Sequence, residues 1–135
     1  MRKQYHFWPG QHGLDAWDVD RLIRLSADLP VVDVPLDVIW ELDTPYWSTP
    51  GDGPSTVRDV IAHMRLVRDV DPSHPVILGA DNRVMDGMHR IVRAVLEDRT
   101  TIRAVRFVVQ PEPDVRDCHP DDLPYDDSSD RPGHP

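Results

Sequence analysis

Residues 75–97 read PVILGADNRVMDGMHRIVRAVLE, and no other stretch of the chain has so clear a pattern. Val76-Ile77-Leu78 is a short apolar run that predicts a strand, followed by a turn at Asp81-Asn82. Arg83-Val84-Met85 predicts a second short strand. Apolar residues at helical spacing then predict a helix from Gly87 to about Asp98. We expect one strand–turn–strand–helix unit here.

The start of this predicted helix is the first candidate site. It is formed by Asp86, Gly87, Met88, His89 and Arg90. A helix start has backbone N–H groups without intrahelical acceptors and the positive end of the helix dipole, which suits a phosphate or carboxylate. Gly87 permits close approach to the backbone, while His89 and Arg90 add donors. A structural alternative is that Asp86 only caps the helix and Gly87 only serves the turn.

The segments around this unit predict a small α+β domain over residues 31–109. A β-branched strand is expected at 31–34, and a turn of helix at 36–40. The clearest helix is 55–70, where Thr56 and Asp59 have capping-box spacing. The remaining two predicted segments are a long Pro- and Gly-rich loop at 42–54 and a closing strand at 101–109.

The two ends of the chain differ in composition from the domain. Residues 1–30 predict an N-terminal extension with a helix at 15–27, capped by Asp15 or Asp18. Residues 110–135 contain eight acidic residues against two arginines and predict an acidic tail without a core of its own. The net charge of the chain is −9, which argues against DNA as the main ligand, because nucleic-acid affinity comes largely from Lys and Arg.

The composition of the chain excludes several kinds of site. The 135-residue chain has one cysteine, so an intrachain disulfide and a multi-cysteine zinc site are excluded. Its seven histidines include no pair at the i, i+4 spacing of a helical zinc site. No apolar run is long enough to span a bilayer and no signal-peptide pattern is present, which favours a cytoplasmic protein.

The central unit, with Asp86-Gly87-Met88-His89-Arg90 in its middle, resembles the ParB/sulfiredoxin superfamily. In that superfamily a Gly-x-His-Arg or Gly-x-Arg-Arg helix start holds nucleotide phosphates. The resemblance covers roughly residues 31–109 and implies a mixed sheet flanked by helices. It also implies a nucleotide-binding site at 86–90, with ATP, ADP or CTP as the ligand.

The superfamily contains several activities. Sulfiredoxins have a reactive cysteine where this chain has Met88, and a thioether cannot act as that nucleophile. ParB partition proteins add a helix-turn-helix domain, and here an acidic tail follows instead. The free serine kinase branch uses a carboxylate after the first strand as general base. The resemblance to this branch implies an ATP/ADP-dependent phosphotransferase or nucleotide hydrolase.

In that interpretation Glu41 or Asp43 is the catalytic base and the sequence does not choose between them. Asp86 would hold Mg²⁺, and residues 86–90 would hold the phosphates. The acceptor would be a small hydroxyl-bearing substrate. A second interpretation remains open, in which the chain is a non-catalytic interaction or regulatory module that uses the 42–54 loop and the tail.

Overall fold

The computed structural model describes residues 3–48 and 53–125 as an α+β protein. The chain divides into two compact units. Residues 29–108 form one, and residues 1–28 together with 109–135 form the other. The predicted 42–54 loop lies partly outside the described residues, as does the end of the predicted tail. None of the described helices is long and apolar enough to cross a membrane.

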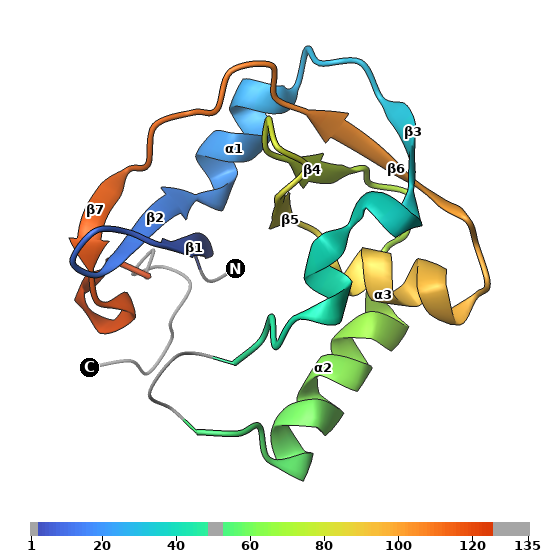
Figure 1. The fold of residues 1–135 in the computed structure, drawn as a ribbon, viewed down its shortest axis with the longest axis horizontal. Helices are drawn as coiled ribbons and strands as arrows, with labels where there is room; N and C mark the ends of the chain where they lie inside the picture. Colours follow the sequence, from blue (N-terminus) through green and yellow to red (C-terminus); the bar gives the residue numbers. More distant parts are fainter. Residues whose placement is uncertain (1–2, 49–52, 126–135) are drawn as a thin grey trace. The chain divides into compact units, whose positions relative to one another are not determined.

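The central unit is built on a four-stranded mixed sheet with the order β3-β6-β4-β5 (Figure 1). β6 pairs antiparallel with β3 and parallel with β4, and β4 pairs antiparallel with β5. The four strands are β3 (Val32–Pro35), β4 (Val76–Leu78), β5 (Val84–Asp86) and β6 (Thr101–Arg106). The strand–turn–strand–helix unit predicted at 75–97 is confirmed by β4, β5 and the helix α3 (Met88–Leu96).

The core of this unit lies between α3 and the sheet. Its buried members come from α3, from the strands, from the short 3₁₀ segment η1 (Leu36–Val38) and from Ile39, which precedes a second 3₁₀ segment, η2 (Trp40–Asp43). The apolar period of α3 places Ile91 and Ala94 in this core, as expected for an amphipathic helix that covers a sheet. The largest fully buried aliphatic side chains of the core cluster are Ile39, Leu78 and Ile91.

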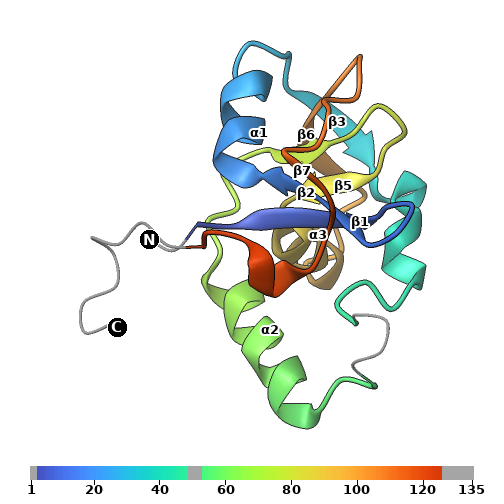
Figure 2. The same ribbon diagram turned by 90° about the vertical axis from the view of Figure 1, so that its left-hand side faces the viewer.

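Helix α2 (Val57–Asp69) has the predicted N-terminus. The Thr56 side chain accepts from the Asp59 N–H at 3.1 Å, and the Asp59 carboxylate accepts from the Thr56 N–H at 3.0 Å. This reciprocal pair is a capping box, which satisfies two backbone donors at the helix start. α2 lies beside α3 and runs away from the four-stranded sheet (Figure 1 and Figure 2).

The terminal unit differs from the prediction in two places. The predicted helix at 15–27 is a strand followed by a helix, β2 (Leu14–Asp18) and α1 (Val19–Ser26), with Asp18 as the N-cap. The predicted tail contributes β7 (Val115–Cys118) and a 3₁₀ turn, η3 (Pro120–Asp122). β2 lies between β1 (Tyr5–Pro9) and β7 in a three-stranded antiparallel sheet. The two ends of the chain therefore form a unit together.

Side chains hold the terminal unit together across about a hundred residues of sequence. The Trp17 indole N–H donates to the Pro111 carbonyl at 2.8 Å, and the Arg21 guanidinium donates to the Asp114 carboxylate at 3.2 Å. Tyr5 packs edge-to-face on Tyr125 with ring centroids 5.3 Å apart. These contacts pack the acidic segment at 111–125, which has no apolar core of its own, against the N-terminal part of the chain.

Candidate functional site

Gly87 fixes the geometry of the α3 start. It is the N-cap residue and has φ 107° and ψ 22°, a left-handed conformation that glycine adopts far more readily than other residues. A methyl group at this position would lie 2.7 Å from the Val76 Cγ1 atom. Gly87 is therefore required both by the backbone angle and by the close approach of β4. Asp86 is not the N-cap, so the structural alternative considered for it does not hold.

No side chain caps the start of α3, and its first turn contains no acidic residue. The N–H groups of Met88 and His89 therefore have no intrahelical acceptor, and they lie at the positive end of the helix dipole. Two of the predicted phosphate donors, the backbone at 88–89 and the His89 ring, are thus brought together at this helix start.

Arg90 is held in place by other parts of the central unit. Its Nη1 atom donates to the His74 carbonyl at 3.1 Å and to the Pro75 carbonyl at 2.7 Å. Its Nη2 atom donates to the Asp86 carboxylate at 3.2 Å. Burial raises the pKa of the Asp86 carboxyl, and the nearby Arg90 charge opposes this rise. The guanidinium therefore joins the first turn of α3 to the segment before β4.

The two candidate bases differ in their burial. Glu41 is 2% exposed, and its Oε1 atom accepts the Val84 N–H at 2.6 Å. Its other oxygen, Oε2, is buried without a hydrogen-bond partner among the described residues. Burial raises the pKa of Glu41, which is opposed by the Val84 hydrogen bond and by the Arg83 charge. Asp43, in contrast, is exposed at the end of η2.

A cavity of about 190 Å³ connects Glu41 to the start of α3. Glu41, Tyr46, Trp47 and Met88 are among the residues that line it. Burial raises the pKa of the Tyr46 hydroxyl, with further contributions from the negative charges of Glu41 and Asp86. The cavity is thus lined by a buried carboxyl group, a phenol and an indole beside an uncapped helix start. Such a set can accept a proton and hold a hydroxyl or a ring.

Trp47 and two histidines form an aromatic cluster next to this cavity. The His63 Nδ1 and His89 Nε2 atoms lie 2.9 Å apart, at hydrogen-bond distance. The two ring centroids are 5.2 Å apart and the rings are 26° from parallel, so the imidazoles lie edge to edge. The Trp47 indole stacks on both, at centroid distances of 3.9 Å to His63 and 5.2 Å to His89.

The local sequence pattern around His63 does not mark it as a site residue. Its partner His89 is on α3 and Trp47 is in the segment after η2, so no local spacing joins the three. The hydrogen bond requires one protonated and one unprotonated nitrogen between the rings. Burial lowers the pKa of both histidines, and mutual repulsion lowers that of His89 further. The neutral pair is therefore the form that the fold favours.

This pair predicts a pH dependence of stability. Below about pH 6.5 the unfolded chain takes up protons on His63 and His89 that the folded chain resists, so the free energy of unfolding should fall as the pH falls. Urea unfolding of the wild type and of His63→Gln between pH 7.5 and 5 measures this. We expect the variant to lose less stability over that range. His74→Gln, a change at an exposed histidine, is the control and should behave as the wild type does.

The predicted Mg²⁺ ligand, Asp86, stands without further acidic partners among the described residues. The described residues contain no group of three or more His, Cys, Asp or Glu side chains able to hold a metal ion. Asp86, the predicted metal ligand, is engaged by the Arg90 guanidinium. Mg²⁺ in nucleotide sites is usually held by one or two carboxylates together with phosphate oxygens and waters, and here the one predicted carboxylate is paired with a cation.

No family model matches this chain, and neither a curated protein nor a solved structure matches it. The resemblance to the ParB/sulfiredoxin superfamily therefore stays a prediction.

Proposed function

We propose that the central unit binds a nucleotide, with a phosphate group at the uncapped start of α3 and the ligand's ring system against Trp47. The observation that carries this proposal is the cavity shared by Glu41, Trp47 and Met88. Its lining includes the buried Glu41 carboxyl group and the first residue of a helix that has free N–H groups and no acidic residue in its first turn. The carboxyl group is complementary to a hydroxyl, and the N–H groups are complementary to a phosphate, of the same ligand.

The roles of the individual residues follow from their positions. The N–H groups of Met88 and His89 would donate to phosphate oxygens, and the half-buried His89 ring lies nearby with its Nε2 atom engaged by His63. Trp47 is 39% exposed and lines the cavity, so its indole can contact a base. Arg90 would act indirectly, by holding the first turn of α3 in place through its contacts with the His74 and Pro75 carbonyls.

The enzymatic form of the proposal is phosphoryl transfer to a small hydroxyl compound. Glu41 Oε2 would accept the proton of the acceptor hydroxyl while the acceptor oxygen bonds to phosphorus and the bond from phosphorus to the leaving phosphate oxygen breaks. A carboxyl with a raised pKa is suited to this role, because its basicity lies closer to neutral pH than that of an exposed carboxylate.

Thermal unfolding with ATP, ADP, CTP and GTP, each with and without Mg²⁺, tests binding. A ligand present at about 100 times its Kd adds about 2.7 kcal/mol to the free energy of unfolding. That increment corresponds to a rise of several degrees in the Tm of a domain of this size. If none of the four nucleotides raises the Tm at millimolar concentration, the proposal is wrong.

Glu41→Gln and Asp43→Asn form a matched pair for the role of the carboxylate. Glutamine retains an acceptor for the Val84 N–H and removes a buried charge, so we expect the Tm of Glu41→Gln without ligand to stay close to that of the wild type. Glu41→Gln should remove any nucleotide turnover, measured as released phosphate or phosphorylated acceptor, while Asp43→Asn should have no effect on turnover. Full turnover by Glu41→Gln would contradict the assignment of the base.

A further inference from the structure

The proposed nucleotide site needs a positive charge that its nearest arginine does not supply. Nucleotide phosphates are anionic, and the chain itself has a net charge of −9. Arg90 already donates to two backbone carbonyls and to the Asp86 carboxylate. No arginine or lysine is among the described residues that line the cavity at the start of α3. A phosphate bound there is best neutralised by a nearby group that can become cationic.

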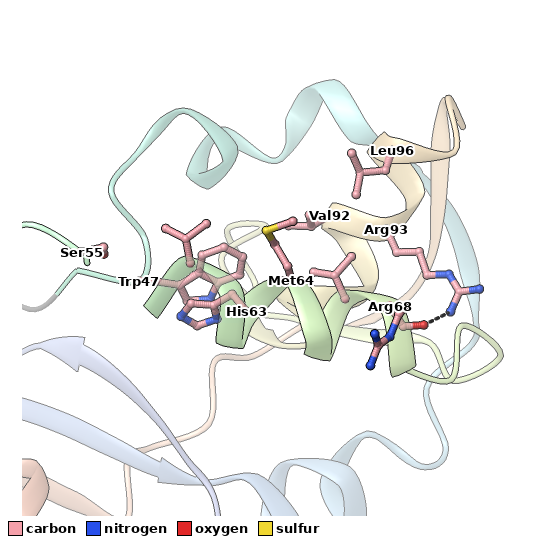
Figure 3. Close-up of a pocket in the computed structure, with 10 residues that line it drawn as sticks. Trp47, Ser55, His63, Met64, Arg68, Val92, Arg93 and Leu96 are labelled. Carbon is pink, nitrogen blue, oxygen red and sulfur yellow. Dashed lines mark hydrogen bonds between the residues drawn. The ribbon is translucent and has the colours of Figure 1, made fainter. Parts of the chain in front are cut away.

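The hydrogen-bonded pair of His63 and His89 is placed to supply that charge. His89 is in the first turn of α3, and its Nε2 atom lies 2.9 Å from the Nδ1 atom of His63. The outer nitrogens of the pair, Nδ1 of His89 and Nε2 of His63, make no hydrogen bond to another described residue. The Trp47 indole stacks on the pair and lies face to face on the His63 imidazole (Figure 3).

The pair can bind one proton without losing its hydrogen bond. In the neutral pair one proton lies between the rings and a second is on one outer nitrogen, so the other outer nitrogen has none. An added proton goes to that nitrogen, and both outer nitrogens are then N–H donors. A further proton would set two N–H groups against each other at 2.9 Å. The singly protonated pair is therefore a cation whose His89 Nδ1–H can donate to a phosphate.

The charges around the pair keep it neutral until an anion binds. Burial lowers the pKa of both imidazoles, and Asp59, one turn before His63 on α2, opposes this for His63. The segment after η2 contributes Tyr46, which is neutral because burial raises the pKa of its hydroxyl. On α3, the charge of Arg90 is paired with Asp86. A phosphate beside the pair adds negative charge and would raise the pKa of the imidazoles.

We propose that the His63–His89 pair takes up one proton when a nucleotide phosphate binds at the start of α3. This inference rests on the function proposed above and makes His63, which no local pattern marks, part of the same site. Because the bound phosphate raises the pKa of the pair above its value in the free protein, the proton and the nucleotide favour each other's binding. The affinity for nucleotide should therefore rise as the pH falls from 8 to 6.5.

Titration calorimetry of the full chain in two buffers of different ionisation enthalpy measures the proton uptake. The ligand is the nucleotide that raises the Tm most. The double variant His63→Asn/His89→Gln is the comparison, because two amides can hydrogen-bond to each other but bind no proton. Since one linked proton permits up to about tenfold per pH unit, we expect the affinity of the wild type to rise at least about threefold more than that of the double variant between pH 8 and 6.5.

The nucleotide's own phosphate also titrates in this range, but it does so with both proteins, so the difference belongs to the pair. His12→Gln, a change at an exposed histidine of the terminal unit, should behave as the wild type does. Equal proton uptake by the wild type and the double variant overturns this inference and leaves the proposed function standing. Absence of nucleotide binding by the wild type overturns both.

Imidazole ¹⁵N spectra of the wild type at pH 7 locate the proton without any substitution. In the free protein we expect one outer nitrogen of the pair to lack a proton. At saturating nucleotide both outer nitrogens, Nε2 of His63 and Nδ1 of His89, should be protonated. Outer nitrogens that stay as they are in the free protein, while the nucleotide is bound, overturn the inference.

Discussion

Gly87→Ala is expected to lower the free energy of unfolding by more than any substitution on the surface of the central unit. The φ of 107° alone costs about 1–3 kcal/mol for a residue with a Cβ. The added methyl group would also lie 2.7 Å from Val76 Cγ1, and Val76 is fully buried in β4, so it has little room to move. Relief of the overlap requires displacement of α3 from the sheet, which adds a packing cost of about 1–3 kcal/mol.

Urea unfolding followed by circular dichroism measures this effect. Gly53→Ala is the matched control, because Gly53 also has a positive φ of 75° but has no atom within 4 Å of the position of an added Cβ. The difference between the two variants measures what the contact with Val76 and the larger φ of Gly87 add to the cost of a positive φ. A Gly87→Ala protein as stable as the wild type would mean that the start of α3 does not have the geometry described above.

Arg90→Met is the second substitution with a large expected effect. It removes the donors to the His74 and Pro75 carbonyls and leaves the mostly buried Asp86 carboxylate without its partner. Loss of one member of a fully buried ion pair costs about 3–5 kcal/mol. The Arg90 and Asp86 side chains are 14% and 20% exposed, so we expect a smaller loss, of about 2–3 kcal/mol.

The effect of Arg90→Met should depend on pH in a defined direction. Without the Arg90 charge, burial should raise the pKa of Asp86 further, so the folded variant binds a proton more readily than the unfolded chain does. The free energy of unfolding of Arg90→Met should then improve relative to the wild type as the pH falls from 7 toward 4. Unfolding of the double variant Arg90→Met/Asp86→Asn tests whether Asp86 is the cause of this pH dependence. If the single variant retains full stability at pH 7, Arg90 is not the structural link described.

The local sequence pattern was sufficient to predict most of the secondary structure of the central unit and the position of one of its site residues. The apolar runs and the capping-box spacing of Thr56 and Asp59 each lie within a few residues of sequence. The two strands and the helix predicted within residues 75–97 are accordingly present in the structure. Gly87 could likewise be placed at a helix start from sequence. Its requirement became clear only from the position of Val76, which is eleven residues earlier in the chain.

The pairing of strands that lie far apart in the sequence could not be predicted from such local patterns. Residues 14–18 have the composition of a helix start, but they form β2 because β1 and the distant β7 flank them. The same holds for the site. His63, His89 and Trp47 come from separate segments, and the choice between Glu41 and Asp43 depends on which side chain turns into the interior. The inward contacts of Arg90 were also not predictable from the motif itself.

We propose that the start of α3 and the adjoining cavity bind a nucleotide. Amide ¹H–¹⁵N spectra recorded during a titration with the nucleotide that raises the Tm most test it directly. We predict saturable shifts of the Met88 and His89 amides and of the Trp47 indole N–H, with the Trp17 indole N–H of the terminal unit unchanged. Unchanged Met88 and His89 amides at saturating nucleotide would contradict the claim.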